Sequence, residues 1–158
     1  MHRSFLAGPD MISSSVRDLL PHAPPMVLLD EVTACDQDQT SAVLKINETS
    51  PFYIKDVGVP SYVGLEYMAQ TCGLFAGIDA QKKGAPIRLG YLLGTRDYHT
   101  SLDVFTLNDS LIITVKTVFQ QEGMAVFDCC ITRNNQEIAT AQLTLYQPNE
   151  TLVETPPT

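Results

Sequence analysis

The stretch Pro60–Ile78, PSYVGLEYMAQTCGLFAGI, is built of apolar, small and neutral polar residues with a single exception. That exception is Glu66, the only charged residue in the stretch. A helix that is apolar around nearly its whole circumference is normally buried. The stretch therefore predicts one long central helix, with Ser61 at its N-cap and with Gly84 and Pro86 just beyond its end.

Glu66 is the first candidate for a functional residue. A carboxyl group that loses its hydration favours the neutral form, and enzymes use such groups to hold or exchange a proton near neutral pH. The alternative is a structural role, in which the carboxylate is tied to a buried Arg or Tyr. Glycines at positions 64, 73 and 77 of the same helix are expected to let backbone or ligand approach closely.

The composition is that of an ordinary globular protein of one domain. The chain has 158 residues, of which 44% are hydrophobic and 18% are charged, and this length is enough to bury a core. A formal net charge of −8 makes nucleic acid and anionic membranes poor partners. An acidic partner would need a local basic patch. Lys82, Lys83 and Arg88 are candidates for such a patch, and a solvated helix end is the alternative.

The cysteines and the N-terminal residues favour a cytoplasmic protein. Cys35, Cys72, Cys129 and Cys130 show no C-x-x-C spacing, so we expect reduced, mostly buried thiols. The first residues carry no signal-peptide pattern. The apolar stretch is near the length of a membrane span, but its polar residues and its glycines argue against a span.

Strand patterns lie on both sides of the central helix. Before the helix we expect a helical turn and a hairpin, and after it only strands joined by tight polar turns. The expected elements are a helical turn over Val16–Leu20 and strands over Met26–Val32, Ser41–Ile46, Ile87–His99, Ser110–Phe119, Met124–Arg133 and Glu137–Tyr146. This segregated order predicts an α+β fold, with a loose arm over residues 1–13, a single domain over 14–148 and a frayed tail over 149–158.

Motifs between about residue 17 and residue 148 resemble one known family. Leu20–Val32, LPHAPPMVLLDEV, is similar to the LPHRxPxLLVDxV stretch of the 3-hydroxyacyl-acyl carrier protein dehydratases, the FabA/FabZ-like group. Pro60–Gln70, PSYVGLEYMAQ, resembles their PGVLxxEAMAQ segment, with the Glu in register. Gly90–Thr100, GYLLGTRDYHT, and Leu143–Pro148, LTLYQP, resemble the ApeP-like branch found in aryl-polyene gene clusters.

This resemblance implies a hotdog fold, in which an antiparallel sheet wraps one long helix and two subunits form a double-hotdog dimer. It implies dehydration of a 3-hydroxyacyl chain to the trans-2-enoyl chain on acyl carrier protein, in fatty-acid or polyene-type biosynthesis. The sequence shows no metal-ligand cluster and no Gly-rich phosphate loop, so we expect no metal and no cofactor. One position departs from the family pattern. Classical members have a catalytic His in a GHFP loop fourteen residues before the helix acid, and this chain has Phe52 there.

The implied reaction needs a base at C2, an acid at the C3 hydroxyl and hydrogen-bond donors at the thioester oxygen. By the resemblance, Glu66 is the acid or a proton shuttle. Gln70, four residues on, lies on the same helix face and orients the carboxyl group or a water. Helix N-termini offer free N–H groups. Ser61, Tyr62 and Val63 occupy that place, and the Ser61 N–H matches the carbonyl-binding glycine of the family.

The base has three possible sources. His22 lies in the matching N-terminal motif and is the preferred histidine, with a structural role as its alternative. His99 ends the strand after the helix, beside Asp97 and Tyr98, and is expected to bind substrate if it points into the tunnel instead of solvent. A partner subunit is the third source.

Two other functions stay open. A hotdog acyl-thioesterase would use the helix carboxylate to activate water. A non-catalytic hotdog subunit would bind acyl chains or complete a partner's active site, and the missing GHFP histidine favours it. The expected partners are acyl carrier protein and a second hotdog subunit, in a homodimer or a heterodimer.

Overall fold

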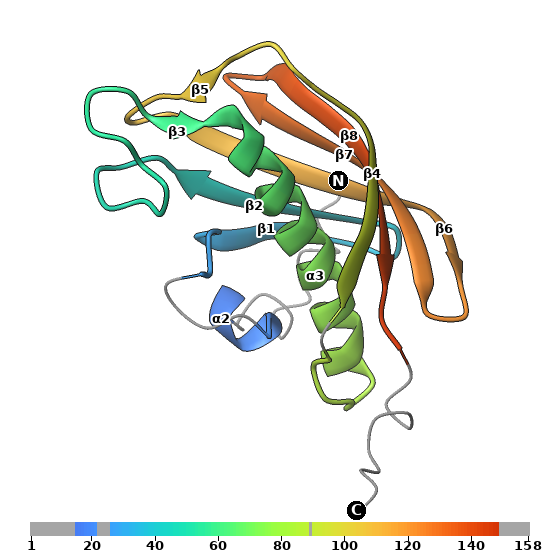
Figure 1. The fold of residues 1–158 in the computed structure, drawn as a ribbon. Coiled ribbons are helices and arrows are strands. Elements are labelled where there is room, and N and C mark those ends of the chain that lie inside the picture. Colours follow the sequence, from blue (N-terminus) through green and yellow to red (C-terminus); the bar gives the residue numbers. More distant parts are fainter. Residues whose placement is uncertain (1–14, 22–25, 89, 149–158) are drawn as a thin grey trace, which may run out of the picture.

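The computed structural model describes residues 15–21, 26–88 and 90–148, so the expected arm (1–13) and tail (149–158) lie outside this part of the chain. Figure 1 shows one long helix, α3, lying against a curved antiparallel sheet. α3 spans Gly64–Lys82 and follows a 3-10 turn, η2, over Ser61–Val63. Beyond the helix, Gly84 has a φ of +68°, which favours glycine and confirms the predicted end. Neither α3 nor any other helix in the described ranges is long and apolar enough to cross a membrane.

Six strands form the main sheet, in the order β1-β2-β6-β7-β8-β4, and all neighbouring pairs are antiparallel. Two turns within it depend on positive φ angles, at Glu122 and Gly123 in one and at Asn134 and Asn135 in the other, as tight hairpins require. The α+β prediction is confirmed. The strands are β1 Glu31–Cys35, β2 Gln39–Lys45, β4 Tyr91–Thr100, β6 Ser110–Gln121, β7 Met124–Arg133 and β8 Gln136–Tyr146.

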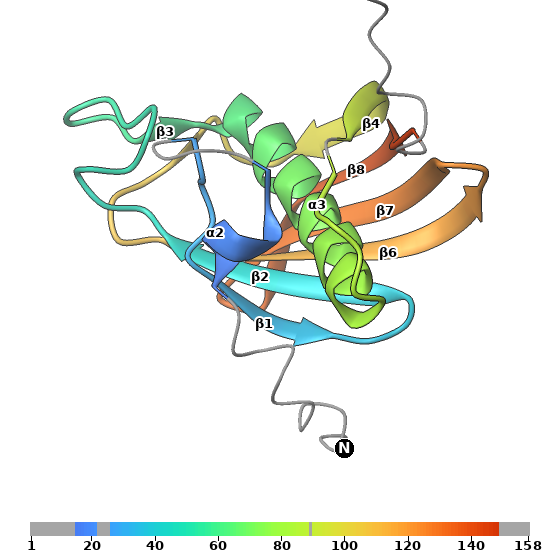
Figure 2. The same cartoon turned by 90° about the horizontal axis from the view of Figure 1, so that it is seen from below.

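The core lies between α3 and one face of the sheet. Figure 2 shows α3 crossing the sheet on this face, with α2 beside it. Alternate residues of β2 and β6 are buried, the pattern of a sheet with one covered face. Met68, Leu74 and Ile78 of the helix are fully buried and belong to the same apolar cluster as Ile113 and Leu143 of the sheet.

The short helix α2, Val16–Leu19, packs against α3. Ser15 caps α2, because its side chain accepts a hydrogen bond from the Asp18 N–H. Gly77 permits the packing, since a Cβ at this position would collide with the backbone carbonyl of Leu19. The expected close approach at a helix glycine is confirmed here.

The first predicted strand, Met26–Val32, begins later than expected, at Glu31. A helix side chain binds the backbone before it. Gln70 Nε2 donates to the Met26 carbonyl at 2.7 Å, and Gln70 Oε1 accepts from the Leu28 N–H at 2.9 Å. The amide therefore takes the place that a neighbouring strand would otherwise fill.

A second sheet of two short strands lies at the start of the helix, and the sequence does not predict it. β3 (Val59–Pro60) pairs with β5 (Val104–Phe105). One residue further on, the Ser61 N–H donates to the Asp103 carbonyl at 2.9 Å. Pro60 is the N-cap of the helical turn, and no side chain caps it. The expected Ser61 cap is wrong, because strand pairing fixes the start of the helix instead.

β4 is an edge strand. It pairs with β8 on one side and, within the described residues, with no strand on the other. All its residues are exposed except Tyr98, which is half-buried. The strand includes Leu92 and Leu93, whose exposed fractions are 45% and 55%. An unpaired edge with apolar side chains is a template for pairing with another chain.

Candidate active site

An open groove follows α3 on the side of β4. Its volume is about 470 Å³, within the usual range for ligand pockets. Glu66 in the first turn of α3 and Lys83 at its end both line the groove, so it extends for about 25 Å at 1.5 Å of rise per residue. These dimensions suit an acyl chain. The lining includes the apolar side chains of Ala69, Phe75, Leu92, Phe127 and Leu145.

Glu66 is half-buried where it lines the groove, and Gln70 contacts it. The distance from Gln70 Nε2 to Glu66 Oε2 is 3.2 Å. Because Gln70 Oε1 already accepts from the Leu28 N–H, the amide presents its NH₂ group to the carboxylate. The amide therefore orients Glu66 as a hydrogen-bond acceptor, and the predicted contact between the two side chains is present.

The three residues expected at the substrate carbonyl make up η2. Ser61 and Val63 are buried, whereas Tyr62 is 71% exposed. The Ser61 N–H is engaged by the Asp103 carbonyl. The Tyr62 N–H lies in the first turn, where no preceding helix carbonyl can accept from it. The N–H of Tyr62 is therefore a donor at the open end of the helix.

The structure brings no described histidine to Glu66. His22 lies outside the described residues. His99 is exposed on β4, whereas its neighbour Tyr98 is half-buried and contacts the start of the helix. Over the described ranges, the groove lining contains no histidine.

Tyr98 is a site residue that the sequence does not predict. Its hydroxyl donates to the Ser61 carbonyl at 2.5 Å. Burial raises the pKa of Tyr98 to about 12, so the phenol is a protonated donor at neutral pH. Gly64 is the sequence signal for this contact, because a Cβ there would collide with the Tyr98 hydroxyl.

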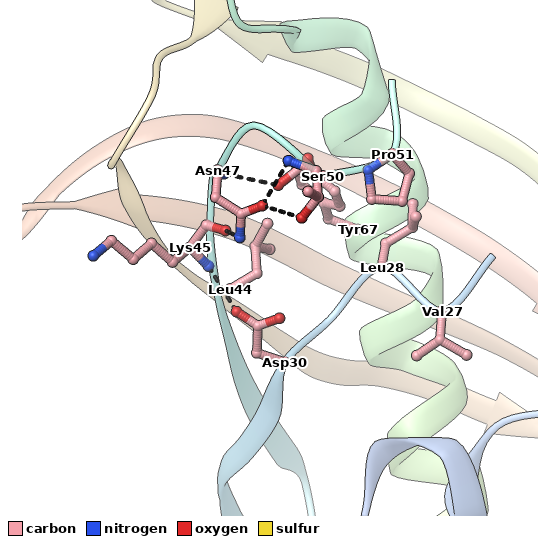
Figure 3. Close-up of a pocket in the computed structure, with 10 residues that line it drawn as sticks. Val27, Leu28, Asp30, Leu44, Lys45, Asn47, Ser50, Pro51 and Tyr67 are labelled. Carbon is pink, nitrogen blue, oxygen red and sulfur yellow. Dashed lines mark hydrogen bonds between the residues drawn. The ribbon is translucent and has the colours of Figure 1, made fainter. Parts of the chain in front are cut away.

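A smaller cavity, of about 150 Å³, lies beside Tyr67 on α3 (Figure 3). Burial, and then the charge of Asp30, raise the pKa of Tyr67. Asp30 accepts from the Lys45 N–H and the Ser50 hydroxyl oxygen accepts from the Asn47 N–H, each at 2.8 Å. The Lys45 side chain extends away from the other labelled side chains (Figure 3). These bonds hold the loop that follows β2.

That loop carries Phe52 at the position where the sequence comparison places the GHFP histidine of classical members. Phe52 has a φ of +70° and is 52% exposed. Ile54 and Val57 are each 49% exposed, and a bridge between Ile54 and Gly58 closes the loop. The loop therefore presents apolar side chains and no histidine.

A long helix wrapped by an antiparallel sheet, with the Glu66 carboxylate in the first helical turn lining an acyl-sized groove, defines a hotdog-fold protein that acts on acyl chains. Residues 14–155 match the ApeP-like family, described as ApeP dehydratase. The chain belongs to this ApeP-like dehydratase family, and the predicted fold and resemblance are confirmed.

Similar proteins agree with this assignment. The 3-hydroxyacyl-[acyl-carrier-protein] dehydratase FabZ of Psychrobacter arcticus is 28% identical over 137 residues, 82% of this chain and 91% of the relative. FabZ of Streptococcus thermophilus is 25% identical over 135 residues, with coverages of 83% and 93%.

Among solved structures, the dehydratase heterocomplex ApeI:P from Xenorhabdus doucetiae has a chain 30% identical, with a TM-score of 0.83, covering 87% of this chain and 93% of that one. A hypothetical thioesterase with coenzyme A from Streptococcus pneumoniae is 18% identical, with a TM-score of 0.60 and coverages of 75% and 85%. This second likeness shows the fold alone.

Proposed function

We propose that this chain takes part in the dehydration of a 3-hydroxyacyl chain on acyl carrier protein, giving the trans-2-enoyl chain and water, with Glu66 in the active site. The position of Glu66 carries the proposal. It is a half-buried carboxylate at an acyl-sized groove, oriented by Gln70. Membership of a dehydratase family and the FabZ relatives support the same reaction.

The reaction moves two protons. A base removes one from C2, the electrons shift toward the thioester oxygen, and the C3 hydroxyl leaves with a proton as water. Glu66 protonates the leaving hydroxyl, or returns the C2 proton to it as a shuttle. The Tyr62 N–H, at the positive end of α3, is the donor for the enolate-like oxygen.

A second hotdog subunit completes this site by supplying the base. The edge of β4 that no described strand covers lies beside the groove and supports a partner at this position. A homodimer would carry Phe52 in both loops and would depend on His22 for its base. A heterodimer could take its base from a histidine of the partner and would not depend on His22. The heterocomplex formed by a similar dehydratase supports a heterodimer.

Acyl carrier protein is the second partner. The basic residues at the end of α3 are candidates for its contact, and two of them already have partners within this chain. Lys83 pairs with Asp79 at 3.0 Å, and Arg88 donates to the Pro148 carbonyl at 3.0 Å. Lys82 is exposed beside them. The Lys83 pair is exposed, and exposed pairs contribute little, so a carrier carboxylate can compete for this lysine.

The cytoplasm is the proposed location of this reaction. Cys72 and Cys129 lie 4.0 Å apart, sulfur to sulfur, and both are free thiols, as are Cys35 and Cys130. Thiols of this kind persist in reducing compartments.

Phe52 favours one other candidate function, that of a subunit without activity of its own that completes a partner's site. Such a subunit would still bind acyl chains in its groove. A thioesterase is distinguished by its product, because it frees the carrier thiol whereas a dehydratase leaves the acyl chain attached.

The test is incubation with a 3-hydroxyacyl-acyl carrier protein while the intact mass of the carrier is followed. The chain is assayed alone and mixed with a histidine-bearing hotdog protein of the same family. The proposal is supported if the wild type removes one water from the carrier-bound chain and Glu66→Gln does not. Glu31→Gln, which changes an exposed carboxylate, is the control and should keep the activity. Water loss that persists in the mixture with Glu66→Gln supports a non-catalytic subunit. A free carrier thiol supports a thioesterase.

A further inference from the structure

The peptide group that joins Ser61 to Tyr62 has an unusual environment. Its carbonyl oxygen accepts from the Tyr98 hydroxyl at 2.5 Å. Its N–H, which belongs to Tyr62, has no helix carbonyl before it. The preceding N–H, of Ser61, is already bonded to Asp103. One peptide is thus held at its oxygen while its N–H is left at the open end of the helix.

Three features of the fold place the Tyr98 hydroxyl. The register between β4 and β8 shifts between Arg96 and His99, and Asp97 has a φ of +56°. Bulges of this kind re-aim a side chain, and Tyr98 is the one residue of β4 that is half-buried. Gly64 then leaves the space that the hydroxyl fills. The bulge, the phenol and the glycine all serve one contact.

We propose that Tyr98 positions and polarises the Ser61–Tyr62 peptide, so that the Tyr62 N–H binds the thioester carbonyl oxygen as negative charge develops on it. This proposal rests on the function proposed above. In a planar trans peptide the N–H points away from the C=O, so Tyr98 leaves the N–H free. A hydrogen bond to the oxygen polarises the group and strengthens its N–H as a donor. Preorganised donors at this oxygen lower the barrier.

Tyr98 is therefore a positioning residue, because it acts on the substrate through the peptide. Its raised pKa, about 12, keeps the proton on the phenol throughout the range in which such an enzyme is assayed. A tyrosine that only tied β4 to the helix would affect stability and would leave the bound carbonyl unchanged. The two roles are thus separable by measurement.

The kinetic test is Tyr98→Phe in whichever assembly, alone or mixed with the second hotdog protein, is active. Loss of one hydrogen bond of about 1.4 kcal/mol predicts a fall in kcat of about tenfold with KM nearly unchanged. Tyr53→Phe is the matched control, because Tyr53 is also half-buried and stands outside the proposed site. An unchanged kcat in Tyr98→Phe overturns the proposal.

The spectroscopic test does not depend on turnover. The probe is a carrier-bound butyryl thioester labelled with carbon-13 at its carbonyl, which lacks the 3-hydroxyl group and is not dehydrated. Binding to the wild-type assembly is expected to lower the infrared stretching frequency of the carbonyl, and Tyr98→Phe to reverse most of that shift. A shift absent from the wild type, or equal in both, overturns the proposal. A wild type that shifts the carbonyl band without dehydrating the hydroxyacyl substrate contradicts the proposed function instead.

Gly64→Ala gives an independent check. Its Cβ would collide with the Tyr98 hydroxyl, so the single variant is expected to displace the phenol and to lose activity. In Gly64→Ala/Tyr98→Phe the hydroxyl is absent, and kcat is expected to return to the level of Tyr98→Phe. If the fall in kcat of the double variant equals the product of the falls in the two single variants, Gly64 and Tyr98 do not act through one contact.

Discussion

The amide nitrogen of Gln70 lies 3.2 Å from Glu66 Oε2, and the same side chain also binds the backbone at Met26 and Leu28. Gln70 is 1% exposed. One buried amide therefore joins the helix carboxylate to the segment that leads into β1.

Gln70→Met is expected to loosen both ends of this connection. The apolar side chain has a similar volume but leaves the Leu28 N–H and the Met26 carbonyl without their partner, at a cost of about 1–3 kcal/mol. Denaturant unfolding measures the loss. The control is Gln142→Met, whose hydrogen bond to Asp128 is exposed and whose effect should stay within about 0.5 kcal/mol. Equal effects of the two variants would contradict the role of Gln70.

Ala69→Leu tests the groove as the acyl site. Ala69 is half-buried and lines the groove, so a larger side chain should shorten the space for an acyl chain. We expect KM to rise about tenfold or more for long hydroxyacyl carriers, since lost apolar burial costs about 0.8 kcal/mol per CH₂. Short chains should be processed as before. Ala34→Leu, on β1 outside the groove, should not discriminate by chain length.

Gly77→Ala is expected to destabilise the fold by about 1–3 kcal/mol, because backbone that cannot yield would meet the new Cβ. The obstacle is the Leu19 carbonyl, so α2 must move away from α3. Gly94→Ala is the control, since a Cβ added there would meet nothing within 4 Å beyond its chain neighbours. Thermal unfolding of the two variants compares them, and similar midpoints would show that α2 is not packed as described.

Raised phenol pKa values predict a loss of stability in alkali. The pKa of Tyr98 is raised from 10.0 to about 12, and burial raises that of Tyr67 as well. Because the unfolded chain loses these protons first, the stability they contribute is complete below about pH 10 and declines as pH rises through about 12. Ultraviolet titration of Tyr98→Phe should lack one phenol that ionises near pH 12. If the phenol that Tyr98→Phe removes from the titration instead ionises near pH 10, Tyr98 is not buried as described.

Leu93→Lys tests the edge of β4 as the contact with a second subunit. Leu93 is 55% exposed on this strand, and a lysine on an edge strand opposes further strand pairing. Native mass spectrometry should show at least a roughly tenfold weaker association, or about 1.4 kcal/mol. Val118→Lys is the control, because Val118 is equally apolar and 53% exposed but lies on β6. Weaker association in the control alone would move the interface away from β4.

The sequence predicts the parts of this fold that have long patterns. α3 and the strands from Ser110 onward follow from apolar periodicity and from turn residues, and β7 has the predicted bounds, Met124–Arg133. The pair Val59–Pro60 and Val104–Phe105 is too short to show a period of two. Its long-range hydrogen bonds nevertheless decide where the helix begins.

The residues of the candidate site also fall into some that the sequence predicts and some that it does not. Glu66 and Gln70 are found from their spacing on one helix, which puts them in contact. Tyr98 is not found, because the bulge after Arg96 changes the residue that faces the helix and such a bulge leaves no clear mark in the sequence. For Gly64 the sequence predicts only a close approach, because its neighbour comes from a strand that follows in the chain.

β4 is joined to the main sheet through β8 alone, within the described residues. β8 spans Gln136–Tyr146, well after β4 in the order of synthesis. A ribosome therefore releases α3 and β4 before the strand that secures β4 exists. Tyr98 and the Ser61 carbonyl can take their final places only when that strand has docked. Glu66 is therefore synthesised early, whereas the donor geometry at the start of the helix forms late. A chain stopped before Gln136 would contain Glu66, but the Tyr62 N–H would not be held in place to bind the thioester oxygen.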